Sequence, residues 1–297
     1  MAKHFADRLF AAVRGKNSRL CVGLDPRLDL LPPELTGDPV ERVEAFCRAI
    51  CETIAPYAAA VKPQAAYFEV LGSPGVACLE RVAAYARELG LPVILDAKRN
   101  DISSTADAYA RAYLAPREDT GVPLADAITV NAYLGHDGVE PFVRMVHEYG
   151  AGLFILVKTS NPGSGQLQDL TLDSGRTVYQ HMAYLVGEWG QEVVGECGYS
   201  SVGAVVGATY PEQLAELRQR LPHTPLLVPG YGHQGATAQD VARAFDKHGL
   251  GAIVNSARSI IYAYRKREGM FTEAAAEAAQ EARDELNGAY QGGTAEA

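Results

Sequence analysis

The sequence predicts a single α/β domain with the (β/α)8 TIM-barrel fold and an extra helix at each end. Eight short apolar runs recur along the chain, each followed by turn residues and then by a longer segment with helical periodicity. The runs are continuous rather than alternating, which is typical of parallel strands covered on both faces. A length of 297 residues suits one barrel, and no repeat or linker divides the chain.

The predicted elements alternate strictly between strand and helix. The strands are residues 20–24, 58–61, 92–95, 127–130, 152–157, 202–207, 226–228 and 252–254. The helices between them are residues 40–54, 75–88, 103–114, 138–149, 175–195, 211–221, 237–248 and 259–267, flanked by 3–14 and 272–286. Eight such units most simply close into a barrel. We therefore assign residues 1–290 to the barrel and 291–297 to a flexible tail.

The structural rival is a doubly wound open sheet. It requires a fingerprint such as Gly-x-Gly-x-x-Gly after the first strand, where this chain has Gly23-Leu24-Asp25-Pro26. Two connections are long, residues 115–125 and 161–174, and the second is rich in Gly, Ser and Pro. A long polar loop beside a strand end is often a lid or an interface element.

The composition limits the kinds of molecule that the protein is expected to bind and the compartment in which it is expected to occur. The formal charge of −9, from 36 acidic and 27 basic residues, disfavours nucleic acid and anionic membranes as partners. We expect a soluble protein of the cytoplasm, because no apolar run is long enough to span a membrane and the N-terminus lacks the pattern of a secretory signal. The five cysteines are odd in number and show no Cys-x-x-Cys spacing, which argues against disulfides and a zinc site.

Charged residues lie at the ends of the first three predicted strands. Asp25 follows the first, Lys62 follows the second, and Asp96 and Lys98 stand at the third. Barrel enzymes carry their active sites at the carboxyl ends of the strands, so these groups are expected to face one mouth. Residues two apart on a strand point to the same side, so Asp96 and Lys98 should project together while Ala97 faces the helices.

Each charged residue also has a purely structural interpretation. Asp25 could cap a turn before a proline, Lys62 could be a solvated loop lysine, and Asp101 could be a helix N-cap. Asp96 and Lys98 could form one structural ion pair. Convergence of four such groups on one mouth favours a functional site, because burying charges without a role is costly.

A second cluster predicts a phosphate site. The glycine-rich run 229–235 follows the seventh strand, and Arg258 follows the eighth. In barrels these two loops frequently bind phosphate through backbone N–H groups and a helix N-terminus, and an arginine can bind the anion with two hydrogen bonds. The bland interpretation is a glycine-rich turn beside a solvent-exposed arginine.

Other chemistries find little support in the sequence. The seven histidines show no metal-ligand spacing such as His-x-x-x-His, so we expect no metal site. There is no Walker loop and no Gly-x-Ser-x-Gly elbow, which disfavours ATP hydrolysis and acyl transfer.

Over nearly its whole length the chain resembles the orotidine 5'-phosphate decarboxylase family, and in particular its longer bacterial branch. The most specific matching segments are residues 21–26, 61–64, 95–105, 157–162, and 229–234 together with Arg258. The resemblance implies conversion of orotidine monophosphate to UMP in pyrimidine synthesis, without a cofactor or a metal, by a homodimer with shared active sites.

The resemblance also implies residue roles. Lys98 would donate a proton to the C6 carbanion, next to Asp96 and Lys62, with Asp101 supplied by the partner subunit. The nucleotide would be bound by Asp25 and Lys62 at the ribose, Ile102 and Thr105 across the dimer interface, Ser160 at the pyrimidine, Gln234 between base and phosphate, and Pro229, Gly232 and Arg258 at the phosphate.

Two residues depart from the family pattern, and two rival functions stay open. Asn100 stands where a small glycine is frequent, and Ala257 is unusual before Arg258; neither removes a reacting group. One rival is a Mg²⁺-dependent sugar-phosphate decarboxylase or lyase of the same barrel type, but Lys62 occupies the place of its metal-binding acid. The other rival is a non-catalytic phosphosugar-binding barrel.

Overall fold

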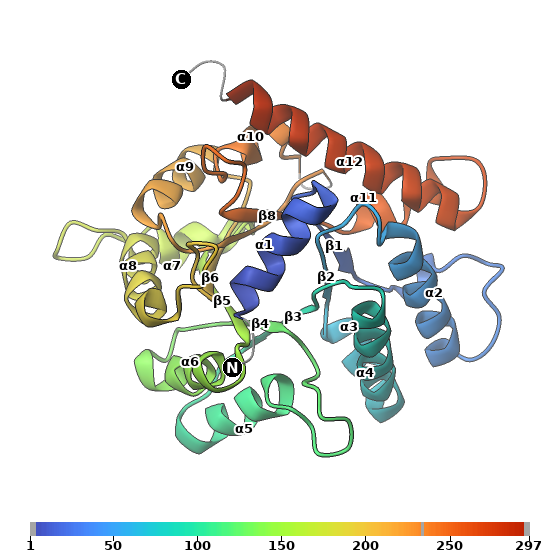
Figure 1. Ribbon diagram of the computed structural model, residues 1–297, viewed down its shortest axis with the longest axis horizontal. Coiled ribbons are helices and arrows are strands. Elements are labelled where there is room, and N and C mark those ends of the chain that lie inside the picture. The colour runs from blue at the N-terminus through green and yellow to red at the C-terminus, as the bar shows by residue number, and fades with distance from the viewer. Residues whose placement is uncertain (1–3, 233–234, 294–297) are drawn as a thin grey trace.

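A parallel sheet forms the centre of the molecule in the computed structural model, which describes residues 4–232 and 235–293 (Figure 1). Within these residues the strands are β1 (Leu20–Leu24), β2 (Ala60–Pro63), β3 (Ile94–Arg99), β4 (Ala127–Val130), β5 (Gly152–Lys158), β6 (Val202–Val206), β7 (Leu226–Pro229) and β8 (Ala252–Ser256). Their order is β2-β1-β8-β7-β6-β5-β4-β3, and bridges Val61–Val93 and Gln64–Asp96 join the two ends of the sheet. The predicted (β/α)8 barrel is confirmed.

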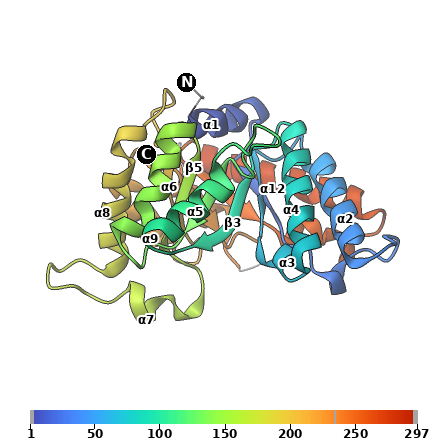
Figure 2. The same cartoon turned by 90° about the horizontal axis from the view of Figure 1, so that it is seen from below.

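Helices surround the barrel between successive strands (Figures 1 and 2). The α-helices are α1 (Phe5–Lys16), α2 (Pro39–Ile54), α3 (Ala66–Glu69), α4 (Gly72–Glu88), α5 (Ser103–Leu114), α6 (His136–Tyr149), α7 (Gly165–Gln168), α8 (Val178–Gly190), α9 (Pro211–Arg220), α10 (Ala238–Ala242), α11 (Arg258–Ile261) and α12 (Phe271–Gly293). Short 3-10 turns are η1 (Leu28–Leu30), η2 (Pro162–Ser164), η3 (Gln191–Val193) and η4 (Ala263–Arg265).

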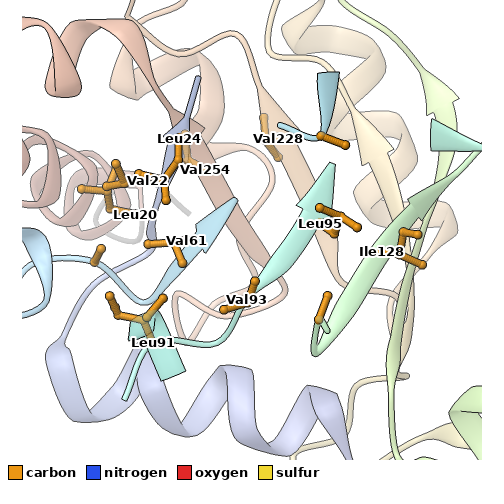
Figure 3. Close-up of a cluster of buried hydrophobic side chains, with 14 of the residues drawn as sticks. Leu20, Val22, Leu24, Val61, Leu91, Val93, Leu95, Ile128, Val228 and Val254 are labelled. Atoms are coloured by element: carbon orange, nitrogen blue, oxygen red, sulfur yellow. The ribbon is translucent and has the colours of Figure 1, made fainter. Parts of the chain in front are cut away.

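The strands bury apolar side chains on both faces, as their continuous apolar sequences predict. Val22, Val61, Leu95 and Ile128 belong to the layer between strands and helices, part of which Figure 3 shows. A separate cluster, which includes Phe154 and Ile253, fills the barrel interior. The two layers leave only the ends of the barrel for polar chemistry.

Helix α1 covers the amino-terminal end of the strands. Phe5 packs edge-on against Phe154, with ring centroids 6.0 Å apart, and both rings belong to the interior cluster. Gly152 begins β5 beneath this helix, where an added Cβ would lie 2.3 Å from the Phe5 ring. Figure 2 shows α1 and α7 at opposite ends of the barrel. The carboxyl ends of the strands therefore form the mouth on the side of α7.

Five strands, β2, β3, β5, β7 and β8, end later than the sequence predicts. β2 covers residues 60–63 rather than 58–61, and β3 covers 94–99 rather than 92–95. The prediction ended each of these two strands at its first charged residue, whereas backbone pairing continues beneath the charged side chains at the mouth. Lys62, Asp96 and Lys98 are thus strand residues, and the interpretation of Lys62 as a solvated loop lysine is wrong.

Among the helices between strands, three predicted ones differ most in extent from the observed helices. The helix predicted over residues 237–248 ends at Ala242, because Asp246 instead accepts hydrogen bonds from the backbone N–H groups of His248 and Leu250. The helix predicted over 175–195 begins at Val178, after a Thr177 capping box, and ends at Gly190. The one predicted over 259–267 is divided into α11 and η4. Helical segments as short as α10, α11 and η4 contain too few residues for hydrophobic periodicity to define their ends in the sequence.

The terminal helices are both longer than predicted toward the C-terminal side. α1 ends at Lys16 and α12 at Gly293, three residues into the segment assigned to a tail. Residues 294–297 lie outside the described residues, so the flexible tail stays a prediction.

Candidate active site

Asp96 lies between two lysines at the mouth of the barrel. Its Oδ2 is 2.5 Å from Nζ of Lys62, and its Oδ1 is 2.5 Å from Nζ of Lys98. Lys62 and Asp96 are buried, whereas the Lys98 side chain is 47% exposed. Ala97 packs toward the helices, so the predicted projection of Asp96 and Lys98 to one side is confirmed. The cluster consists of one fixed lysine, one shared carboxylate and one lysine that reaches open space.

Thr129 on β4 fixes the local geometry of this cluster. Its hydroxyl donates to Asp96 Oδ1 at 3.0 Å and accepts from the backbone N–H groups of Ala97 and Lys98 at 3.1 and 2.9 Å. Lys98 itself has φ of +47°, and the pairing of β3 with β4 shifts register between Leu95 and Arg99. A non-glycine residue in the left-handed region is a strained conformation found often at functional sites. Sequence reasoning missed Thr129.

The shared charges shift the pKa values of the buried pair in opposite directions. Burial alone would raise the pKa of Asp96, but Lys62 and Lys98 outweigh it and hold this pKa well below the usual aspartate range. Burial alone would lower the pKa of Lys62, but Asp96 and Asp25 outweigh it and raise this pKa. Asp96 therefore stays a carboxylate and Lys62 an ammonium throughout the neutral pH range.

At Asp25, directly after β1, the neighbouring cations do not outweigh the effect of burial on the pKa. Its Oδ1 is buried and has no hydrogen-bond partner among the described residues. Burial raises the pKa of Asp25; Lys62 opposes the shift and Asp96 adds to it. A buried acceptor without a donor is destabilising, and a ligand hydroxyl at this position would satisfy it.

Asp101, Ile102 and Thr105 follow β3, around the start of α5. Asp101 accepts a hydrogen bond from the N–H of Ile102 at 2.8 Å, and in the described part of the chain no ion pair joins it to Lys98. Ile102, not Asp101, is the N-cap of α5, and no side chain caps this end. The N-cap interpretation of Asp101 is therefore wrong. Ile102 is 48% exposed, and Thr105 is exposed as well.

Ser160 follows β5 and sits beside the end of β6. An added Cβ at Gly207 would lie 2.9 Å from the Cβ of Ser160, so glycine is required for this close approach. The last residue of β5, Lys158, is fully buried, and its Nζ pairs with Asp169 Oδ1 at 2.7 Å. Lys158 belongs to a segment that matches the family, and the sequence predicts no separate role for it.

The predicted phosphate loops lie on neighbouring strands. Pro229 ends β7 opposite Asn255 of β8, and Arg258 begins α11 directly after β8. Gly232 has φ of +78°, and an added Cβ there would lie 3.3 Å from the Ser259 hydroxyl. The two loops therefore meet, as predicted. Gln234 lies outside the described residues.

The two departures from the family pattern fit the structure. The Cβ of Ala257 would be 2.7 Å from a Cβ added at Gly23, so a glycine at position 23 makes room for the larger residue at 257. Asn100 lies beside the start of α6, where its Oδ1 is 3.8 Å from a Cβ added at Gly138.

The described residues contain neither a cluster of metal-binding side chains nor a membrane-spanning helix. No group of three or more His, Cys, Asp or Glu side chains there is placed to hold a metal ion. Likewise, none of the helices in residues 4–232 and 235–293 combines the length and apolar character that crossing a membrane requires.

Comparison with known proteins gives consistent results. A sequence model described as "Orotidine 5'-phosphate decarboxylase / HUMPS family" matches residues 18–270. A protein named orotidine 5'-phosphate decarboxylase from Rhodopirellula baltica is 50% identical over 273 residues, which cover 89% of this chain and 90% of that protein. One of the same name from Deinococcus radiodurans is 45% identical over 290 residues, 97% of this chain and 99% of that one.

A solved structure shares the same fold. A Toxoplasma gondii protein assigned as an orotidine monophosphate decarboxylase superimposes with a TM-score of 0.84 at 35% identity, and 99% of each chain is covered. The barrel, the family match over most of the chain and these relatives agree. The chain belongs to the orotidine 5'-phosphate decarboxylase / HUMPS family.

Proposed function

We propose that the protein is a carboxy-lyase that converts orotidine monophosphate to UMP, without a cofactor or metal ion, in pyrimidine biosynthesis. The observation that carries the proposal is the Lys62–Asp96–Lys98 cluster at the barrel mouth, with its two 2.5 Å ion pairs. The names of the relatives support the substrate. Family membership alone would not separate this reaction from other phosphosugar chemistry on the same barrel.

The residues supply what the reaction needs. The bond between C6 and the carboxylate breaks, CO₂ leaves, and the electron pair stays on C6, where Lys98 Nζ delivers a proton. A carbanion without an electron sink needs preorganised positive charge and a nearby acid, and Lys98 provides both. Asp96 fixes Lys98 and places negative charge near the substrate carboxylate, which favours its departure as neutral CO₂.

In this proposal the other predicted site residues bind the nucleotide. Asp25, with its buried unpartnered Oδ1, and Lys62 bind the ribose hydroxyls. Ser160 meets the pyrimidine at the end of β5. The loops after β7 and β8 bind the phosphate through Pro229, Gly232, Gln234 and Arg258. Phosphate binding far from C6 supplies energy that can close the glycine-rich loop and residues 161–168 over the base.

The active unit in this proposal is a homodimer in which each site borrows residues from its neighbour. Asp101 lies at the rim without an ion pair to Lys98 in its own chain, although the implied role places it at the reacting lysine. The rim near it exposes large apolar side chains, Ile102, Tyr133 and Leu134, at 48, 72 and 44%. Partner contact would bury this surface and bring Asp101, Ile102 and Thr105 to the second site.

The Mg²⁺-dependent sugar-phosphate lyase is the nearest rival. Its second strand should end in a metal-binding acid, but β2 carries Lys62, whose ammonium is paired with Asp96. A cation at this place disfavours a bound metal ion. The non-catalytic barrel would bind the same ligand and release no CO₂.

One experiment separates the three functions. Purified protein in excess chelator is mixed with orotidine monophosphate, and CO₂ release is followed together with the absorbance of the pyrimidine. We expect turnover in the chelator. Turnover of a hexulose phosphate that requires added Mg²⁺ would support the lyase instead, and nucleotide binding without CO₂ release would support the binding protein.

A further inference from the structure

We propose that Lys158 is a positioning residue that holds residues 159–170 in the arrangement that presents Ser160 to the ligand. Lys158 acts through Asp169 and does not itself contact the nucleotide. The inference rests on the proposed function for its ligand, because the segment it fixes contains Ser160, the residue assigned to the pyrimidine.

The environment of Lys158 is a closed cation site. The residue ends β5 with no exposed surface, and its Nζ lies 2.7 Å from Asp169 Oδ1. The ammonium also lies 5.6 Å from the ring centroid of Tyr179 and 4.8 Å from that of Tyr210. Aromatic faces attract cations at such distances. One carboxylate and two aromatic rings thus replace the water that a lysine normally keeps around its charge.

The two partners of the ion pair differ in burial. We call the Lys158–Asp169 pair the latch, because it can hold the segment in place. Lys158 is part of the barrel wall, whereas Asp169 follows the short helix α7 and its side chain is 42% exposed. If the segment lifts away, Asp169 regains water but Lys158 stays buried among the aromatic rings without a counter-ion. A buried unpaired charge is strongly unfavourable. The buried lysine therefore favours the arrangement in which Asp169 is paired, and closure of residues 161–168 over the base is a separate step.

Hydrogen bonds transmit this restraint to the barrel mouth. Gln168, next to Asp169, accepts from the N–H of Thr159 at 2.9 Å and donates from Nε2 to the Thr159 hydroxyl at 2.8 Å. Ser160 follows Thr159 directly and packs on Gly207. Fixing Asp169 thus fixes Gln168, which fixes the backbone that carries Ser160.

The aromatic side of the latch is anchored independently. The Tyr179 hydroxyl donates to Glu216 Oε2 of α9 at 2.9 Å, and Gln180 donates to the other oxygen of Glu216 at 2.6 Å. The wall around Lys158 thereby belongs to the α8 and α9 layer, and the mobile partner in an opening motion would be the Asp169 side. Preordering a binding segment before the ligand arrives improves affinity, because less ordering remains to be done on binding.

The test uses two variants of the full chain that break the latch from opposite sides. Asp169→Asn removes the counter-ion, and Lys158→Met keeps the aliphatic stem among the tyrosines while removing the buried charge. Asp119→Asn, in an exposed ion pair with Arg117, is the matched control. Asp169→Glu is the conservative rescue. The readouts are kcat and KM for orotidine monophosphate, the UMP dissociation constant, and backbone hydrogen exchange of residues 159–170.

We expect both latch variants to raise KM and the UMP dissociation constant about tenfold, while kcat changes much less. Exchange in residues 159–170 should increase in the free protein and fall again with UMP. The double variant should be no worse than either single one, because both remove the same interaction. Asp119→Asn should match the wild type, and Asp169→Glu should recover most of the affinity.

Unchanged exchange and KM in both folded variants would overturn the latch, as would a loss of kcat at constant KM. Failure of the proposed function looks different: the wild type itself would not release CO₂, while hydrogen exchange in the free protein would still report on the segment. If Asp169→Asn does not fold, Lys158→Met decides the outcome, because it leaves no unpaired buried charge.

Discussion

Asp96 holds Lys62 and Lys98 at equal distances of 2.5 Å, but the two lysines differ in their exposure to solvent. The Lys62 side chain is 6% exposed and the Lys98 side chain 47%. The same carboxylate therefore fixes one ammonium inside the wall and presents the other to the space where a ligand would lie. This division separates the group that sets the electrostatics from the group that can transfer a proton.

Thr129→Val is predicted to disturb the cluster without removing a charge. Valine keeps the shape of threonine but loses the donor to Asp96 and the acceptor for two backbone N–H groups. We expect a loss of about 1–3 kcal/mol in the free energy of unfolding. We also expect kcat to fall about tenfold. Denaturant titration and steady-state kinetics check both, with Thr120→Val on an exposed loop as control. Wild-type kinetics in Thr129→Val would show that Thr129 does not contribute to the geometry that catalysis requires.

Asp25→Asn is predicted to stabilise the free protein and weaken nucleotide binding. The pKa of Asp25 is raised in the folded state, so the wild type loses stability as the pH rises above the ordinary aspartate pKa of about 3.9. Asparagine carries no charge to bury. The stability gain should therefore be small at pH 3, grow as the pH rises, and then level off. Unfolding titrations across this range with UMP binding at pH 7 check it, and a gain largest at low pH would refute it.

Arg258→Met is predicted to weaken the binding of the nucleotide phosphate and to leave the binding of the nucleoside unchanged. Hydrogen bonds to charged groups contribute about 1.5–3 kcal/mol, so UMP affinity should fall about 10- to 100-fold. Uridine, which lacks the phosphate, should bind both proteins equally. Calorimetric titration of the two ligands measures the difference. An equal loss for uridine and UMP would place Arg258 elsewhere in the site.

The shared-site proposal predicts complementation between two inactive variants. Lys98→Ala and Asp101→Ala are mixed, unfolded and refolded together. Half of the dimers should be mixed, each with one intact site, so about a quarter of wild-type activity should return. Sedimentation and native mass spectrometry verify the mixed dimers. Their presence without activity would show that each site is built within one chain.

The sequence was most informative where apolar patterning and backbone pairing end together. Residues 20–24 and 127–130 were predicted with the bounds that β1 and β4 have. The end of β2 was predicted wrongly because Lys62 is a charged residue inside a strand, a placement that its pairing with Asp96 on β3 stabilises. Local patterning carries no information about a partner from another strand.

The site residues that the sequence did not predict were missed for the same reason. In the sequence Thr129 is an ordinary β-branched residue of a predicted strand, because none of its sequence neighbours identifies Asp96 as its hydrogen-bond partner. Asp169 and Gln168 lie in the segment 161–174, which the sequence predicts as a loop and the structure shows to contain α7. Lys98, in contrast, was found because its two neighbouring aspartates stand in one short run.

Lys98→Ala in excess chelator is the most direct test of the central claim, which is that this ammonium protonates the carbanion left by CO₂. Its CO₂ release from orotidine monophosphate should fall by about 10²–10⁴-fold or more while UMP binding persists. Near wild-type turnover in Lys98→Ala would contradict the account.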